Sequence, residues 1–123
     1  MRPGSDAQTP SVFEVVRRAV AVCDPDGDDE RSAELLLAYE DRDEPVTALG
    51  DRDRTFFETA ERIAGDLPAP GLELAAAVAT YLAFRRDEVA DDEDLLRLAA
   101  RAEYGDVLPP DVAAWLADAG IAV

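Results

Sequence analysis

The segment GLELAAAVATYLAFRRD, residues 71–87, decides the fold of this chain. Its large apolar residues Leu74, Val78 and Leu82 recur every four residues and form one stripe of a helix, and alanines lie on both flanks of that stripe. The arginine doublet Arg85-Arg86 closes the segment, where positive charge complements the negative end of the helix dipole. The pattern therefore predicts a long helix that is apolar on more than one side.

Two roles fit such a helix. Its small alanine faces would let a neighbouring helix approach closely, and that neighbour can belong to the same chain or to a second copy. We expect the segment to be the central core helix, and we keep a homodimer seam as the alternative.

Further helical segments are predicted on both sides of this one, because apolar residues recur at three to four positions between turn signals. Ser11 and Glu14 have the spacing of a capping box, which marks the start of the first helix. The expected ranges are 11–23, 29–40, 53–64, 91–105 and 110–120. Val46–Leu49 has weak strand character, but a lone strand would have no partner. We predict an all-α fold, a single compact bundle of five to six short helices with mixed crossing angles.

The domain organisation follows from the same pattern. Residues 1–9 contain Pro3, Gly4 and polar residues without periodicity, so we expect a flexible tail and a single helical domain over residues 10–123. Phe56, Phe57 and Trp115 are expected to anchor the core. In the second helix we expect Ala33, Leu36, Leu37 and Tyr39 to face it. Asp53 is the expected N-terminal cap of the third helix.

The side-chain inventory restricts the chemistry. The chain has 12 basic residues, all arginine, against 28 acidic residues, and it lacks histidine and lysine. Histidine-activated serine or cysteine nucleophiles and lysine Schiff bases are therefore excluded. The alternative is a carboxylate-dependent hydrolase, with or without the help of a divalent cation. Our main expectation is a protein with no catalytic residues and no cofactor.

The net charge of −16 has two interpretations. It can be an adaptation to high intracellular salt, or it can be a local functional surface. Nucleic-acid binding is not expected, because phosphate contacts need a basic patch. An acidic protein that mimics DNA is an open alternative. No apolar run is long enough for a membrane span, so we expect no membrane association.

The strongest local motif is the alternation of Asp24, Asp26 and Asp28, which could place carboxylate oxygens around Ca²⁺ or Mg²⁺. The match to a helix–loop–helix calcium site fails at Asp29, where the glycine belongs, and at Leu35, where a bidentate glutamate belongs. The main expectation is a solvated turn that caps the next helix, with the metal site as a weak alternative.

Two other features have competing interpretations. Cys23 continues the apolar face of the first helix and is expected to be a buried, inert thiol. The doublets Arg17-Arg18 and Arg85-Arg86 could bind an acidic ligand, but pairing with the many carboxylates is the main expectation.

By elimination we expect a small non-catalytic interaction module, whose partner is another protein or a second copy. The single cysteine and the absence of a secretory signal in the first residues favour the cytoplasm.

Overall fold

The computed structural model describes residues 10–49, 54–67, 69–84 and 92–121. Within these ranges the chain forms six α-helices and one short 3₁₀ helix, and no strand is present in them. The helices are α2 (Val12–Cys23), α3 (Glu30–Ala38), α4 (Thr55–Ala64), α5 (Pro70–Phe84), α6 (Asp92–Tyr104) and α7 (Pro110–Asp118), and the 3₁₀ helix η1 is Val46–Ala48. The all-α bundle predicted from sequence is confirmed. The expected tail of residues 1–9 lies outside the described residues.

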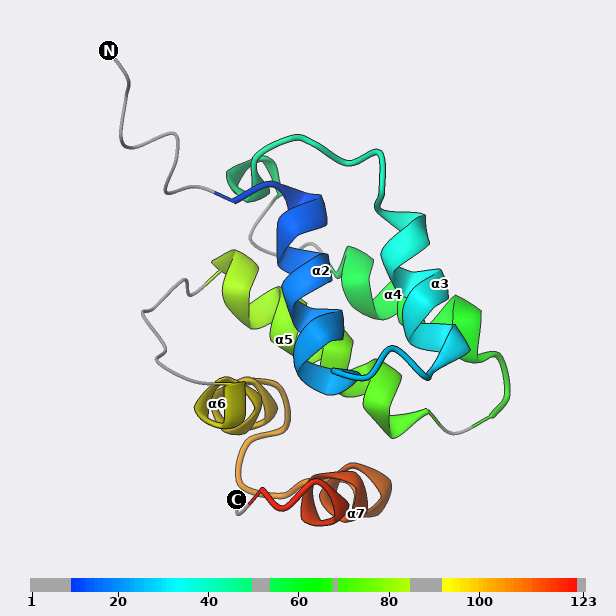
Figure 1. The fold of residues 1–123 in the computed structure, drawn as a ribbon. Coiled ribbons are helices and arrows are strands. Elements are labelled where there is room, and N and C mark those ends of the chain that lie inside the picture. The colour runs from blue at the N-terminus through cyan, green and yellow to red at the C-terminus, as the bar shows by residue number, and fades with distance from the viewer. Residues whose placement is uncertain (1–9, 50–53, 68, 85–91, 122–123) are drawn as a thin grey trace.

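Helix α5 occupies the centre of the bundle (Figure 1), where it packs against α2, α3, α4, α6 and α7. Its buried side chains lie on every side of the helix; they are Leu72, Leu74–Ala79, Tyr81 and Ala83. This arrangement confirms the core role of the segment. It also leaves α5 without an exposed apolar face, among its described side chains, for a second copy of the chain to contact.

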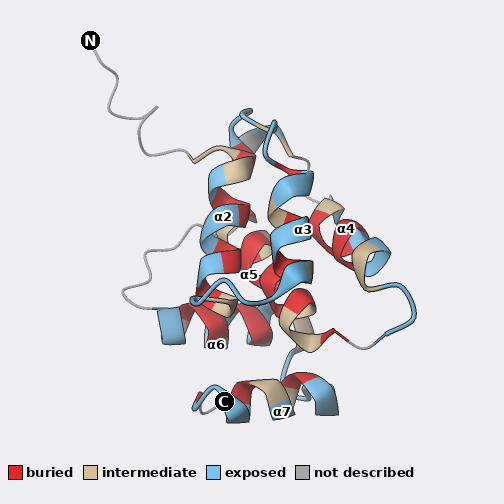
Figure 2. Ribbon diagram, turned by 45° about the vertical axis from the view of Figure 1, so that its right-hand side comes forward, coloured by how far each residue is buried: buried red, intermediate tan, exposed pale blue. Residues whose placement is uncertain are grey.

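The other helices pack onto α5 in different directions. In Figure 1, α2 and α3 run side by side down one face of α5, whereas α6 is seen nearly along its axis and α7 lies across the end of the bundle. Figure 2 shows that the buried faces of α2, α3 and α4 turn inward and that their exposed faces turn to solvent. The crossing angles are therefore mixed, as the short and unequal helices predict.

The start of α2 is fixed by local hydrogen bonds. The Glu14 amide donates to Ser11 Oγ over 3.1 Å, and the Ser11 amide donates to Glu14 Oε1 over 3.0 Å, which is the predicted capping box. The Val46 amide donates to the Pro10 carbonyl over 2.9 Å, so the 3₁₀ helix is held beside this end of α2. The segment with weak strand character, Val46–Leu49, contains this 3₁₀ helix, and Val46 packs into the core as part of a single tight turn.

The predicted core face of α3 was wrong in part. Leu37 is 61% exposed and Ala33 is also exposed, whereas Leu35 and Tyr39 are buried. The buried face recurs at Ser32, Leu35 and Tyr39, spaced three and four residues apart. Ser32 can lie inward because its hydroxyl donates to Asp29 Oδ2 over 3.2 Å.

The three aromatic residues expected to anchor the core differ in how deeply they are buried. Phe56 and Phe57 are buried, as predicted, whereas Trp115 is half-buried and packs against the core from α7. The N-cap of α4 is Arg54, whose side chain makes no capping hydrogen bond. The expected cap, Asp53, lies outside the described residues. Within the described ranges, no helix has the length and apolar character that crossing a membrane requires.

Candidate ligand pocket

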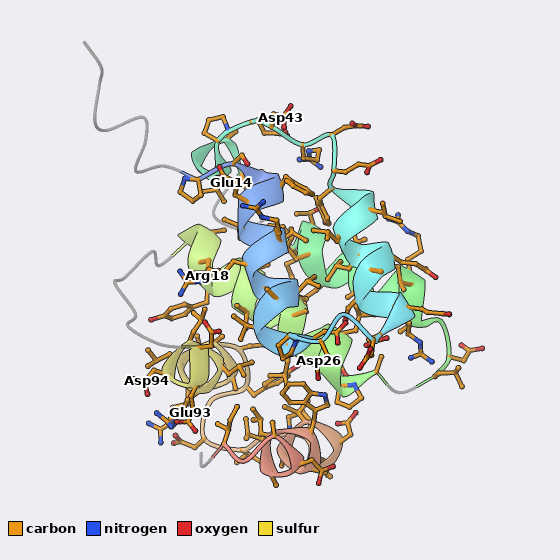
Figure 3. The ribbon with its side chains drawn as sticks, viewed as in Figure 1. Glu14, Arg18, Asp26, Asp43, Glu93 and Asp94 are labelled. Atoms are coloured by element: carbon orange, nitrogen blue, oxygen red, sulfur yellow. The ribbon has the colours of Figure 1, made fainter. Side chains whose placement is uncertain are left out.

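The aspartate-rich turn between α2 and α3 acts as a cap. Asp24 accepts hydrogen bonds from the amides of Asp28, over 3.1 Å, and Asp29, over 3.0 Å, through its two carboxylate oxygens. Asp26 and Asp28 are exposed, and Figure 3 shows Asp26 on the loop between α2 and α3. No group of three acidic or thiol side chains in the described part of the chain is arranged to hold a metal ion. Metal binding at Asp24, Asp26 and Asp28 stays a prediction.

Cys23 and the first arginine doublet have no special environment. Burial, assisted by the neighbouring Asp24 carboxylate, raises the pKa of the Cys23 thiol to about 12, so the reactive thiolate is disfavoured at neutral pH. Arg17 and Arg18 are exposed on α2, and Arg18 makes no ion pair with a described carboxylate (Figure 3). Arg85 and Arg86 lie outside the described residues.

A pocket of about 300 Å³ opens where α4, the start of α5 and the end of α6 meet. One wall comes from α4 and the chain that follows it, the second from α5 and the third from Glu103 and Tyr104 of α6. Its apolar lining residues are Phe57, Ala60, Ala64, Leu67, Ala69 and Leu72. Apolar walls with a few convergent polar groups are typical of small-molecule sites.

The polar lining carries more negative than positive charge. Three carboxylates, those of Glu61, Glu73 and Glu103, share the pocket with the Arg54 guanidinium. Arg54 Nη2 lies 3.3 Å from Glu103 Oε2, and its guanidinium carbon lies 4.6 Å from the centre of the Phe57 ring. Arg54 is thus already paired and stacked. Glu61 and Glu73 have no ion-pair partner among the described residues.

Glu73 has an unusual environment for a carboxylate. Burial raises its pKa, and the negative charges of Asp111 and Glu61 raise it further. Glu73 also lies in the first turn of α5, where the helix dipole favours the ionised form. Burial and repulsion therefore outweigh the dipole, and the ionised carboxylate lacks a positive group to balance it.

Tyr104, in the wall from α6, has a buried hydroxyl that makes no hydrogen bond with any described residue. Burial, and then the charge of Glu73, raises the pKa of this phenol well above its usual range. An unpaired buried hydroxyl costs about 1–3 kcal/mol, so such groups are rare in the absence of a function. Among the described residues, the Tyr104 hydroxyl therefore has no hydrogen-bond partner and the Glu73 carboxyl has no ion-pair partner.

Sequence reasoning did not find this pocket. Arg54, Glu73 and Tyr104 lie far apart along the chain and form no local motif. One signal was available, since Glu73 stands between Leu72 and Leu74 within the most apolar helix of the chain. A charged residue at such a position marks either a solvent-facing edge or a functional group.

Comparison with known proteins gave no match: no family model fits the chain, and neither a curated protein nor a solved structure is significantly similar to it.

Proposed function

We propose that this protein is a small non-catalytic binding module and that the pocket between α4, α5 and α6 is its recognition site. The observation that carries the proposal is the convergence of the uncompensated Glu73 carboxyl and the unpaired Tyr104 hydroxyl in one apolar-walled pocket. Neither the Glu73 carboxyl nor the Tyr104 hydroxyl stabilises the fold. A ligand that contacts both groups would offset the free-energy cost of leaving them without partners.

The chemistry of the lining supports binding over catalysis. No histidine or lysine exists in the chain, and Cys23 is not among the lining residues. The lining hydroxyl is a phenol whose pKa is raised, which makes it a poor base and a poor nucleophile. A binding site needs neither property.

A carboxylate-dependent hydrolase is the second candidate, and the raised pKa of Glu73 favours it. A protonated Glu73 would serve as general acid, and Glu61 in the same lining would serve as general base. This candidate predicts turnover of nitrophenyl esters or glycosides that Glu73→Gln abolishes. If the wild-type protein releases no nitrophenol above the buffer rate, this candidate is rejected.

A protein partner remains compatible with the same site. Leu67 lines the pocket and is 62% exposed, so its side chain forms an apolar rim that a partner would cover. The cytoplasmic location expected from sequence is part of this proposal.

The test is a fragment screen by nuclear magnetic resonance with the intact chain and a variant whose pocket is filled. Ala64→Phe places a ring in the pocket, whereas Ala33→Phe places one on the exposed face of α3. The proposal expects fragments to shift the amides of pocket residues in the wild type and in Ala33→Phe, and not in Ala64→Phe. Fragments that bind only elsewhere, or equally to all three proteins, would reject it.

A further inference from the structure

We infer that the ligand of the pocket is a small organic cation, an ammonium group carried on a compact apolar body. This inference rests on the proposed function and assigns the chemical class of the ligand. It follows from the charge, the walls and the size of the pocket, taken in turn.

The charge of the lining calls for a cation. The Arg54 guanidinium is paired with Glu103, which leaves Glu61 and Glu73 as the unbalanced charges of the lining. Asp111 of α7 adds a further negative charge close to Glu73. An ammonium group beside these carboxylates replaces repulsion by attraction, and it donates three hydrogen bonds to groups that accept them.

The walls exclude a bare metal ion as the main occupant. In the residues that the structure describes, no group of three acidic side chains is close enough for metal coordination. Six of the lining residues are apolar, from Phe57 to Leu72, and they would gain nothing from a hydrated metal ion. A cation that also buries an apolar body uses both kinds of lining, because apolar burial adds to the charge interaction.

The size of the pocket sets the size of the ligand. A volume of about 300 Å³ lies at the small end of the range of about 300–1,000 Å³ that is typical of small-molecule pockets. A single aromatic ring with a short aminoalkyl arm fits this volume.

The proposal predicts how affinity depends on pH. The titratable and charged groups around the site are Arg54 and Glu61 of α4, Glu73 of α5, Glu103 and Tyr104 of α6, and Asp111 of α7. Burial and the charges of Asp111 and Glu61 raise the pKa of Glu73, so this carboxyl ionises at a higher pH than an ordinary glutamate does. Affinity for the cation therefore rises with pH as Glu73 ionises, and the bound cation lowers the pKa of Glu73.

The test compares benzylammonium with benzyl alcohol, which has the same shape without the charge, and with benzoate, which has the opposite charge. Each is titrated into the full chain and followed by chemical-shift mapping and calorimetry. We expect benzylammonium to bind in the pocket at least about tenfold more tightly than benzyl alcohol, and benzoate to bind least. Glu73→Gln should remove that preference.

Glu58→Gln is the matched control, because it removes one carboxylate from an exposed position of α4 outside the pocket lining. It should keep the preference for the cation, which separates local recognition from general attraction to a chain of net charge −16. Thermal melts of both variants show whether each is folded. An arginine-containing tripeptide is the fourth test ligand. If it binds more tightly than benzylammonium does, the natural ligand is a protein side chain and the assignment of a small amine is wrong.

The failure of this inference differs from the failure of the proposed function. If benzyl alcohol or benzoate binds in the pocket as tightly as benzylammonium does, the ligand class is wrong and the binding site stands. If no member of the series shifts any pocket amide at millimolar concentration, the proposed site and the ligand class both fail.

Discussion

At the residue scale, two tyrosines in the same bundle have opposite hydrogen-bond environments. Tyr39 Oη donates to the Thr55 carbonyl over 2.9 Å and lies 2.9 Å from Thr59 Oγ1, and the residue is 2% exposed. Tyr104 Oη is buried without a partner among the described residues. The first hydroxyl ties α3 to α4, and the second contributes nothing to the fold.

This contrast predicts unequal effects of removing each hydroxyl. Tyr39→Phe leaves Thr59 without its cross-helix partner and should lower the free energy of unfolding by about 1–2 kcal/mol. Tyr104→Phe removes an unpaired polar atom and should leave that free energy unchanged or raise it by up to about 1 kcal/mol. Urea denaturation measures both values. A larger loss for Tyr104→Phe than for Tyr39→Phe would contradict the assigned environments.

Glu73 provides a second prediction at this scale. Its pKa is raised in the folded state. The ionised carboxylate therefore destabilises the fold electrostatically, whereas the protonated carboxyl does not. Stability from this group is present below the pKa of the unfolded chain and is lost as pH rises through the higher folded value. Glu73→Gln should therefore be more stable than the wild type at neutral pH, and the difference should vanish in acid. Urea denaturation at several pH values checks this, and a variant that is less stable at neutral pH would refute it.

At the element scale, helix ends and faces show what local patterns can predict. The capping box of Ser11 and Glu14 was predicted because both bonds form within one turn of chain. The core face of α3 was misassigned, because Leu36 and Leu37 both look apolar and only packing decides that Leu37 points outward. The start of α4 has no such local signal, because its N-cap Arg54 makes no side-chain capping hydrogen bond.

No local sequence pattern could have predicted the pocket. Arg54 and Glu103 meet through an ion pair between the start of α4 and the end of α6, which requires both helices to be placed on α5 first. The sequence thus predicted the elements and the central helix, whereas the site depends on the relative placement of three elements.

The capping box gives a prediction for α2. The amide and then the hydroxyl of Ser11 lower the pKa of Glu14, so this carboxylate stabilises the fold above its unfolded pKa and the effect is lost as pH falls through the folded value. Ser11→Ala should cost about 1 kcal/mol of stability at neutral pH. The backbone amide of residue 11 remains in this variant, so the pKa of Glu14, followed by carbon-detected nuclear magnetic resonance, should move only part of the way back toward 4.5, its ordinary value. Unchanged stability together with an unmoved Glu14 pKa in Ser11→Ala would show that the Ser11 hydroxyl does not take part in the cap.

The contact between α5 and α7 can be tested at Gly71. A methyl group there would lie 2.9 Å from Trp115 Nε1, so the indole must move. Overpacking of this kind costs about 1–3 kcal/mol, which exceeds the gain of about 0.5–1 kcal/mol from replacing glycine by alanine in a helix. Gly71→Ala should lower stability and shift the fluorescence of Trp115, the single tryptophan of the chain. Unchanged emission would mean that α7 does not pack there.

At the scale of the whole molecule, charge repulsion opposes the compact state. The net charge is −16, and the described ion pairs involve Arg42, Arg54 and Arg97 with partly exposed side chains. Exposed pairs contribute about 0–1 kcal/mol each, so they offset little of the repulsion. The bundle therefore depends on its apolar core around α5 and on screening by salt.

Salt should therefore stabilise the protein. The Debye length falls from about 30 Å at 0.01 M to about 3 Å at 1 M, which screens most pairs of surface carboxylates. The melting temperature should rise continuously as NaCl is added over this range. Circular dichroism at the helical minimum measures it, and a flat or falling melting temperature would count against both the repulsion argument and the proposed salt adaptation.

The central claim, that an ammonium ligand sits between α4, α5 and α6, is tested most directly by intermolecular nuclear Overhauser effects in the benzylammonium complex. We expect contacts from the ring protons of the ligand to the methyl groups of Ala60, Ala64 and Leu72. Contacts confined to other methyl groups, or none at a saturating amine concentration, would contradict it.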